Sequence, residues 1–171
     1  MRTWAGFTYV AFVIDVFARM IVGWKADTNM RAALVADTLE MAVWARGRTG
    51  ISDLAGLTHH SDAGARHVSF ALTERLAALG MRASIGTVAD AYDNALAEST
   101  IGLFKTELIR RRGPWRTLDD VEITTLEWVD WFNNRRLHTE LGDIPPTEHE
   151  TDHYRQNPAS TTLETGEPSL H

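Results

Sequence analysis

The sequence predicts an α/β domain in which a mixed sheet is flanked by helices. Apolar runs typical of strands alternate with segments whose apolar residues recur every three or four positions, as in amphipathic helices. The expected order is ββ-α-β-α-β-α-α, and such alternation favours one sheet covered by helices. The 171 residues suffice for one domain with a full core. We therefore expect one domain over residues 1–154 and a disordered tail over residues 155–171, which has little to bury.

Two strands are expected near the start of the chain. Residues 7–15 (FTYVAFVID) are mostly apolar on both faces, which is typical of a strand buried on both sides of a sheet. The segment VFAR then turns the chain, and residues 20–26 (MIVGWKA) run back. Residues 7–26 thus predict a β-hairpin.

Helices and strands then alternate. Asn29 is the expected N-cap of a helix that stops at Gly47. Its apolar positions, spaced three or four residues apart, are Ala32, Val35, Ala36, Leu39, Ala42 and Val43. A short strand around residues 57–60 follows, then a helix over residues 69–80 that a serine opens and a glycine closes, and a strand over residues 81–86 (MRASIG).

Two longer helices complete the order. The first is expected to begin at residue 93 or 94 and to continue to about Arg112, where Gly113-Pro114 ends it. Thr117 with Asp120 three residues later is the pattern of a capping box for the last helix. One face of that helix is formed by Leu118, Val121, Thr125, Trp128, Val129 and Phe132.

Composition excludes several classes of protein. With 0 Cys the chain has no disulfide and no thiolate metal site, which suits a reducing cytoplasm. No stretch approaches the roughly 18 unbroken apolar residues of a membrane helix, and the N-terminus lacks a signal sequence. We therefore expect a cytoplasmic protein with no membrane partner. The net charge of −6 argues against a polyanionic partner, but residues 102–116 carry five cations against one acid.

Asp62 and Glu98 are the candidate chemical residues. Asp62 follows the short strand, where α/β folds place functional groups, and Glu98 lies in the first turns of the long helix. The 35 residues between them (98 − 62 = 36 positions) can form a helix, a strand and a loop that bring the chain back alongside. Two carboxylates in contact repel each other, so one of them protonates unless a cation binds between them. Oxygen ligands favour Mg²⁺ or Mn²⁺, which can activate a water or hydroxyl against a phosphodiester. The alternative is that Asp62 is an ordinary turn or cap residue.

Neighbouring side chains permit further interpretations. Glu98, Gly102 and Lys105 recur at four and three residues, so they share a helix face on which Lys105 could hold a DNA phosphate. A solvated polar face explains the same spacing. His59, His60 and His67 suggest zinc, but adjacent histidines on a strand, such as His59 and His60, point to opposite faces and cannot easily bind one ion.

Polar and basic residues also gather at the end of the last helix. Residues 131–146 (WFNNRRLHTELGDIPP) contain Asn133, Asn134, Arg135, Arg136 and His138. Such side chains can reach phosphates, because cations suit a helix C-terminus. Helix capping alone explains the same residues.

Several of these segments together resemble a known family. HSDAGARHVS at residues 60–69, YDNALAESTIGLFKTELI at residues 92–109 and WVDWFNNRRLHTELGDIPP at residues 128–146 are similar to the catalytic core of insertion-sequence transposases of the IS-three type. These transposases belong to the DDE superfamily with retroviral-type integrases and share an RNase H-like fold. With the hairpin FTYVAFVIDVFARMIVGW, the resemblance spans roughly residues 3–154.

The resemblance implies a function and its residues. It implies Mg²⁺-dependent strand cleavage and strand transfer on DNA, at the ends of an element and in a target. By that match Asp62 and Glu98 are the second and third acids of a metal-binding triad. Asn94 lies in the family's DNA-x-AE block, and Lys105 corresponds to a DNA-contacting lysine of related integrases. Further copies of the chain or a full-length transposase are the expected protein partners.

One feature departs from the family. The family's first catalytic aspartate lies on the first strand, in a pattern like D-F/I-T-Y, whereas the FTYV of residues 7–10 follows Gly6 and aligns better with the second strand. We therefore expect a fold without its first strand, and impaired catalysis. Asp15 is the nearest candidate substitute, but it matches a family aspartate that is not catalytic.

Two other functions compete with a transposase core. A non-catalytic module would pair with a full-length transposase or hold DNA through Lys105, Arg110, Arg111 and Arg112. An RNase H-like nuclease acting alone would need a complete acidic site. Metal-dependent cleavage identifies an enzyme, whereas salt-sensitive binding without cleavage identifies a module.

Overall fold

In the part of the chain that the structure describes, the strands form three separate pairs. The computed structural model describes residues 1–51, 53–61, 70–85 and 90–157. The antiparallel pairs are β1 (Arg2–Thr3) with β2 (Gly6–Phe7) and β3 (Tyr9–Ile14) with β4 (Ile21–Asp27), and the parallel pair is β5 (Thr58–Ser61) with β6 (Arg82–Ile85). Within these ranges, no ladder joins the pairs into one sheet.

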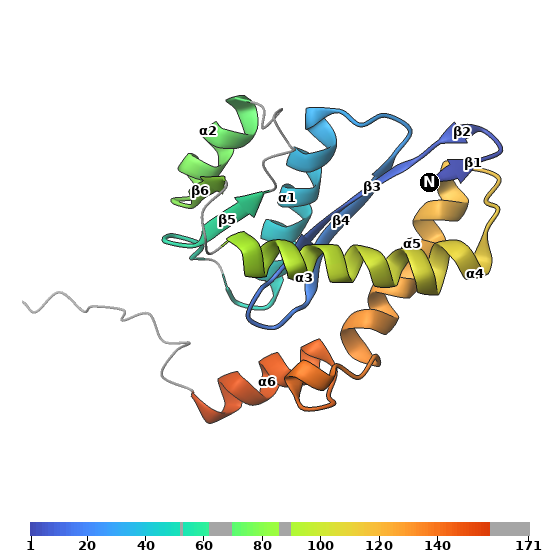
Figure 1. The fold of residues 1–171 in the computed structure, drawn as a ribbon. Helices are drawn as coiled ribbons and strands as arrows, with labels where there is room; N and C mark the ends of the chain where they lie inside the picture. Colours follow the sequence, from blue (N-terminus) through green and yellow to red (C-terminus); the bar gives the residue numbers. More distant parts are fainter. Residues whose placement is uncertain (52, 62–69, 86–89, 158–171) are drawn as a thin grey trace, which may run out of the picture.

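Helices pack around the two longer strand pairs. They are α1 (Ala32–Arg48), α2 (Phe70–Ala78), α3 (Asp90–Leu103), the π-helix η1 (Phe104–Ile109), α4 (Arg110–Arg112), α5 (Leu118–Asn134), the 3₁₀-helix η2 (Thr139–Leu141) and α6 (Pro146–Gln156). Helix α1 packs on β3 and β4, α5 contacts β4, and α3 contacts β5 (Figure 1). The predicted mixture of strands flanked by helices is confirmed.

The predicted hairpin is present, but its first strand is shorter and less buried than expected. Phe7 belongs to β2, and β3 begins at Tyr9. From Val10 to Ile14 every residue of β3 is only half-buried, so the expectation of burial on both faces is wrong. The pairing of Phe12 with Trp24 fixes the register on β4.

The larger core joins the hairpin to the helices. The ring of Phe12 lies 5.0 Å from that of Phe104, which lies 5.1 Å from Trp128, and Trp128 lies 5.0 Å from Phe132. These rings connect β3, η1 and α5 in one chain of aromatic contacts, each of which adds to the burial of apolar area. A smaller core of leucines on α1 and α2 consists of Leu39, Leu72 and Leu76.

The start of α5 agrees with the prediction, whereas both ends of α1 differ from it. The capping box of Thr117 and Asp120 is confirmed. The N-cap of α1 is Arg31, without a side-chain cap, whereas the backbone N–H of Asn29 donates to Asp27 at 3.0 Å in a turn. Helix α1 also runs to Arg48, past the expected stop at Gly47.

Helix α6 was not expected. It begins with a proline at its first position and extends to Gln156, so Arg155 and Gln156 belong to a helix rather than to the predicted tail. The rest of that predicted tail, from residue 158, lies outside the described residues. None of the described helices combines the length and apolar character that crossing a membrane requires.

Gly23 allows α1 to lie directly on β4. A Cβ atom at Gly23 would lie 2.4 Å from the backbone oxygen of Thr38 and 2.9 Å from the Cβ of Ala42. We expect Gly23→Ala to lower the free energy of unfolding by about 1–3 kcal/mol, because the helix must shift. Urea unfolding measures this. Gly47→Ala is the control: its Cβ would meet no atom within 4 Å, and a gain of about 0.5–1 kcal/mol is expected.

Candidate active site

The two candidate metal ligands come from neighbouring elements. Strand β5 ends one residue before Asp62, which itself lies outside the described residues. Helix α3, which carries Glu98, contacts β5. His60 of β5 and both residues that precede Glu98, Leu96 and Ala97, line one cavity. The fold therefore brings the segments that flank the two acids to the same place, as the spacing predicts.

Glu98 is an exposed carboxylate on a well-anchored helix. Leu96 and Thr100 are buried on the core side of α3, which leaves Glu98 on the exposed side. In the described part of the chain its carboxylate forms no hydrogen bond or ion pair, so its oxygens are available to a hard cation such as Mg²⁺ or Mn²⁺. Asn94 lies one turn earlier on α3, and its side chain is outside the described part.

The histidines of β5 lie beside the same cavity. Burial lowers the pKa of His59, and the neighbouring His60 lowers it further. Both effects favour the neutral form of His59, whose backbone is paired in register with Ala83 of β6. Among the residues that the structure describes, no three His, Asp or Glu side chains gather as a metal-binding group. Because Asp62 is outside that set, the predicted carboxylate site stays a prediction.

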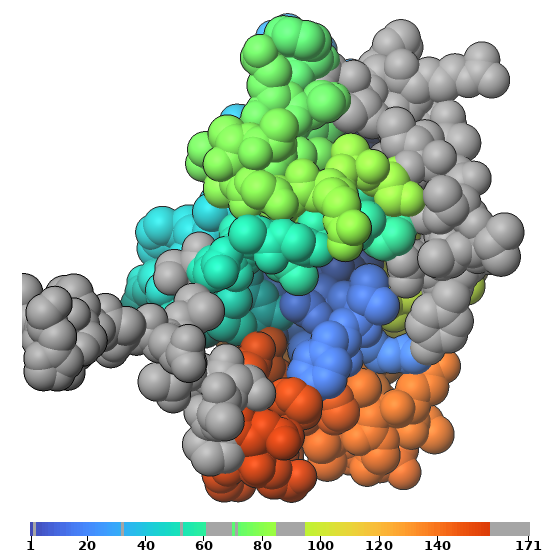
Figure 2. Space-filling model, turned by 90° about the vertical axis from the view of Figure 1, so that its left-hand side faces the viewer, coloured from blue at the N-terminus to red at the C-terminus, as the bar shows by residue number. Residues whose placement is uncertain are grey.

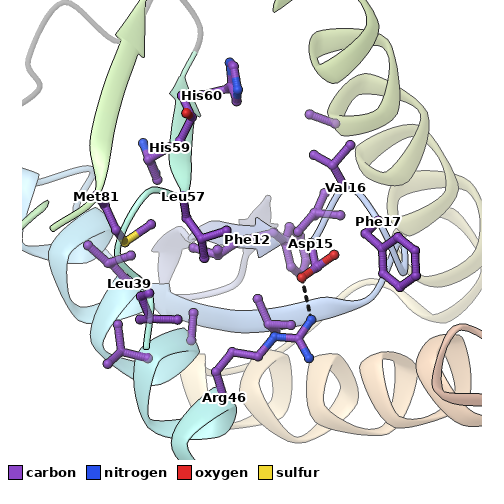
Figure 3. A pocket seen from close by; sticks show the side chains of 18 of the residues that line it. Phe12, Asp15, Val16, Phe17, Leu39, Arg46, Leu57, His59, His60 and Met81 are labelled. Carbon is purple, nitrogen blue, oxygen red and sulfur yellow. Dashed lines mark hydrogen bonds and ion pairs between the residues drawn. The ribbon is translucent and has the colours of Figure 1, made fainter. Parts of the chain in front are cut away.

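Asp15 is engaged in a buried ion-pair network. One carboxylate oxygen accepts the backbone N–H of Ala18 at 3.0 Å, and the other contacts the Arg46 guanidinium at 2.5 Å. Figure 3 shows the contact between Asp15 and Arg46. Arg46, 7% exposed, also contacts Glu150 of α6 at 2.6 Å, and Glu150 is 9% exposed. Both oxygens of Asp15 are thus engaged, one by the turn after β3 and the other by Arg46, which in turn contacts α6. This supports the view that Asp15 is no substitute for a metal ligand.

The sequence interpretation missed Arg46 and Glu150. A signal existed for Arg46, because it lies one turn beyond Ala42 and Val43 on the apolar face of α1. An arginine on a buried face requires carboxylate partners. The identity of those partners could not be read from the sequence, since Glu150 is 104 residues away.

Three candidate DNA-binding cations have no ion-pair partner among the described residues. Lys105, Arg110 and Arg111 are exposed, on η1 and α4. Lys105 lies in the π-helix, so the α-helical spacing that relates it to Glu98 does not continue through its position. A Cβ at Gly102 would meet no atom within 4 Å, so this glycine leaves open surface beside the lysine.

The other candidate cations are paired within the fold. Arg112 contacts Glu127 at 2.9 Å and Arg135 contacts Asp130 at 3.3 Å, both on the exposed surface, where such pairs break at little cost. The side chain of Arg136 is 21% exposed and contacts Glu107 at 3.3 Å. Arg112 and Arg135 can exchange a carboxylate for a phosphate more easily than Arg136 can.

His138 gives the fold a pH dependence. Its buried ring lies 4.7 Å from that of Phe132. Burial lowers the pKa of His138 below 6.5, Arg136 and Arg19 add to the lowering, and the Phe132 backbone and Glu107 oppose it. Well above pH 6.5, His138 is neutral in both the folded and the unfolded chain. As the pH falls through about 6.5, the unfolded chain binds a proton that the folded chain does not, so stability falls.

We expect the free energy of unfolding to decrease between pH 7.5 and pH 5 less steeply in His138→Gln than in the unsubstituted chain. One such group contributes a slope of at most about 1.4 kcal/mol per pH unit. Urea unfolding at several pH values measures the slopes. Parallel curves for the two chains would show that His138 does not contribute.

Comparison with known proteins agrees with this geometry. A family model described as "Integrase core domain" matches residues 1–91, and a second model with the same description matches residues 79–146. The chain belongs to the integrase core domain family. A chain of the simian T-cell lymphotropic virus intasome in complex with PP2A regulatory subunit B56 gamma superposes with a TM-score of 0.65 at 11% identity, covering 100% of this chain and 54% of that one. The predicted RNase H-like fold class is confirmed.

The similar curated proteins are insertion-sequence transposases. The putative transposase for insertion sequence element IS986/IS6110 of Mycobacterium tuberculosis (strain ATCC 25618 / H37Rv) is 50% identical over 162 residues, 94% of this chain and 58% of the relative. The transposase for IS629 of Shigella sonnei is 50% identical over 90% of this chain and 50% of the relative. Transposase InsF for IS3A of Escherichia coli (strain K12) is 30% identical over 88% and 50%. The predicted IS-three relationship is confirmed, and the chain spans about half the length of these relatives.

Proposed function

We propose that this chain is the catalytic-core part of an insertion-sequence transposase, acting in metal-dependent DNA strand cleavage and strand transfer. The observation that carries the proposal is the contact between β5, which ends next to Asp62, and α3, which bears Glu98, in a member of the integrase core domain family. Two carboxylates that come close together repel each other, and a divalent cation bound to both would offset that repulsion.

The proposed roles follow from residue chemistry. Asp62 and Glu98 would hold Mg²⁺ or Mn²⁺. The bound ion would supply an activated water or hydroxyl for attack on a phosphodiester and would stabilise the leaving oxygen. Asn94 and Lys105 would bind and orient DNA beside that site. Because Asp15 is engaged by Arg46, it does not supply a further carboxylate, and we expect cleavage by this chain alone to be weak.

Cleavage of an oligonucleotide that carries the element's end tests the proposal. Cleavage is expected with Mn²⁺ or Mg²⁺ and not with EDTA. Calorimetry with Mn²⁺ alone is the second measurement, because metal binding does not require a high turnover. Absence of both Mn²⁺ binding and cleavage would contradict the proposal that the chain is a metal-dependent enzyme.

A non-catalytic DNA-binding or transposase-interacting module is the second candidate. The observation that favours it is the exposure of Lys105, Arg110 and Arg111 without ion-pair partners in the described part of the chain. Salt-sensitive DNA binding that persists in EDTA, without cleavage, would identify this function.

The arginines of α4 have a measurable effect in either case. We expect the double variant Arg110→Gln/Arg111→Gln to bind duplex DNA more weakly. The slope of the logarithm of the binding constant against the logarithm of the salt concentration should become about 2 less steep, since each phosphate contact contributes about 0.9. Titrations at several salt concentrations measure the slope. Arg155→Gln on α6, an exposed arginine paired with Asp152 at 2.8 Å, is the control and should leave the slope unchanged. An equal slope in all three chains would remove α4 from the DNA-binding surface.

The remaining proposals concern partners and location. The fold neighbour is described as part of an intasome, and we propose that this chain likewise assembles with DNA and with further transposase copies. We also propose that the chain acts in the cytoplasm, where the DNA of the element would be.

A further inference from the structure

Trp4 lies at the tip of the short hairpin formed by β1 and β2. Its side chain is 74% exposed, although an indole is among the largest apolar groups that a fold can bury. Thr3 pairs with Gly6, so Trp4 and Ala5 form a two-residue turn. Gly6 has a φ of +130°, which residues with a Cβ atom rarely adopt. The geometry of the hairpin therefore presents Trp4 to solvent.

Contacts on two sides restrain Trp4. Its backbone N–H donates to the backbone oxygen of Trp115 at 3.0 Å, and Trp115 is buried in the larger core, with 6% of its surface exposed. The guanidinium of Arg116 lies over the Trp4 ring, 5.8 Å from its centroid, which is within the range of a cation–π contact. The indole is therefore held with a cation over one face, and its high exposure leaves the other face to solvent.

The surroundings of Trp4 are positively charged. Arg116 is exposed, and its guanidinium forms no ion pair with a described residue. The nearby carboxylate of Asp120 accepts the backbone N–H of Arg116 at 3.1 Å and belongs to the capping box of α5, so it is already engaged. The hairpin contacts the segment between α4 and α5, which places it close to the exposed Arg110 and Arg111 (Figure 1). An anionic ligand at Trp4 therefore meets more than one cation.

An exposed indole beside arginines fits an unpaired nucleotide. Every nucleobase has an aromatic face that can stack on an indole, and the adjoining phosphates bind cations. Within a duplex both faces of a base are already stacked on its neighbours, and a base must leave that stack to meet a protein ring. The open face of Trp4 therefore suits single-stranded or locally unpaired DNA better than an intact duplex.

We propose that Trp4 and Arg116 form a stacking platform for an unpaired base of DNA, and that the arginines of α4 hold the flanking phosphates. The choice of DNA as the nucleic acid rests on the proposed function. The preference for an unpaired base rests on the exposure of Trp4 and on the cations around it.

The stacking platform lies at the end of the molecule away from Glu98. Helices α3, η1 and α4 follow one another without a break, and the positions from Glu98 to Arg112 (112 − 98 = 14) correspond to about 20 Å along a helix. Helix α3 begins at the side formed by α2, β5 and α6, which Figure 2 turns to the viewer, whereas β1 and β2 lie beside the other end (Figure 1). At about 3.4 Å per nucleotide, a DNA strand along this surface would place about six nucleotides between Glu98 and the platform.

Binding of short oligonucleotides to the full chain in EDTA tests the stacking platform. The probe is a fluorescently labelled oligothymidine of about eight nucleotides, within the usual range of single-strand sites, and fluorescence anisotropy measures its Kd. Trp4→Ala should weaken binding about 5- to 150-fold, the effect of losing one stacked base. Trp4→Phe should keep part of the affinity, because phenylalanine retains an aromatic face. An abasic oligonucleotide of the same length should bind equally to the unsubstituted chain and to Trp4→Ala.

Trp44 supplies a matched control. It is 62% exposed and has the guanidinium of Arg48 at 5.0 Å from its ring centroid, but it lies on α1 rather than beside α4. Trp44→Ala should leave oligothymidine binding unchanged. Arg116→Gln should make the slope of the logarithm of the binding constant against the logarithm of the salt concentration about 0.7 less steep, since one phosphate contact of a single strand is lost. Trp4→Ala should leave that slope unchanged, and thermal unfolding confirms that each variant folds.

Three results would overturn the proposal. Unchanged oligothymidine binding in Trp4→Ala would remove Trp4 from the DNA-binding surface, and a loss of self-association in the same variant, measured by sedimentation, would identify a second copy of this chain as the partner. An equal loss of affinity for the abasic oligonucleotide would show that Trp4 does not stack on a base. An equal loss for a duplex of the same length would show that Trp4 contacts paired DNA.

The stacking platform and the proposed enzyme fail in different measurements. Mn²⁺ binding and cleavage together with unchanged oligothymidine binding in Trp4→Ala would refute the platform and leave the proposed function standing. Binding that depends on the bases and on Trp4, without Mn²⁺ binding or cleavage, would refute the metal-dependent enzyme and leave the platform standing.

Discussion

Arg46→Met is expected to lower the free energy of unfolding by about 3–5 kcal/mol, the usual cost of removing one member of a buried charge network. Arg46 is 7% exposed and contacts Asp15 and Glu150 at 2.5 and 2.6 Å. Methionine keeps most of the packing of the side chain but leaves two carboxylates without a cation. Urea unfolding followed by circular dichroism measures the loss.

Two further variants separate the network from a loss of packing. Arg48→Met, in the same last turn of α1 but exposed, should change stability by no more than about 1 kcal/mol, since it loses only a contact over the Trp44 ring. Adding Asp15→Asn and Glu150→Gln to Arg46→Met should restore part of the stability, because the uncompensated charges are removed. A loss of less than about 1 kcal/mol in Arg46→Met would mean that the network does not hold α6.

Glu98→Gln is expected to reduce metal-dependent cleavage about 10²-fold or more, because a carboxylate ligand supports several kcal/mol of transition-state stabilisation by the ion. The amide is nearly the same size but carries no charge, so Mn²⁺ binding measured by calorimetry should weaken in parallel. Glu98 is exposed and forms no ion pair with a described residue, so the folded state should keep its stability.

Glu74→Gln on α2 is the matched control, since Glu74 is another exposed glutamate on a helix. It should leave cleavage and Mn²⁺ binding unchanged. Unchanged Mn²⁺ affinity in Glu98→Gln would remove Glu98 from the metal site, even if cleavage decreased.

Local signals in the sequence predicted most of the elements. The capping box of Thr117 and Asp120 and the apolar face of α5 depend only on neighbouring residues, and both are present. Helix α6 was missed because its apolar content is low and one of its buried residues is Glu150, which packs through charge on Arg46. No pattern of hydrophobic spacing reveals a helix that is held in this way.

The candidate site was predicted less completely than the fold. Spacing alone indicated that β5 and α3 would meet, and they do. It could not show that Arg136 is occupied by Glu107, because that contact joins residues 29 positions apart. It also could not show that the strands within the described ranges form separate pairs, since the pairing of strands distant in the sequence depends on the tertiary fold.

The π-helix sets the angular relationship between the two ends of one continuous helical rod. In an α-helix each residue turns the chain by about 100°, and the wider turns of η1 change that phase between Glu98 and Arg110. Removing one residue from residues 104–109 would rotate the α4 arginines about the helix axis while Glu98 stayed in place. The direction in which the α4 arginines point is therefore adjustable by a single insertion or deletion, without a change at the end of the helix that carries Glu98.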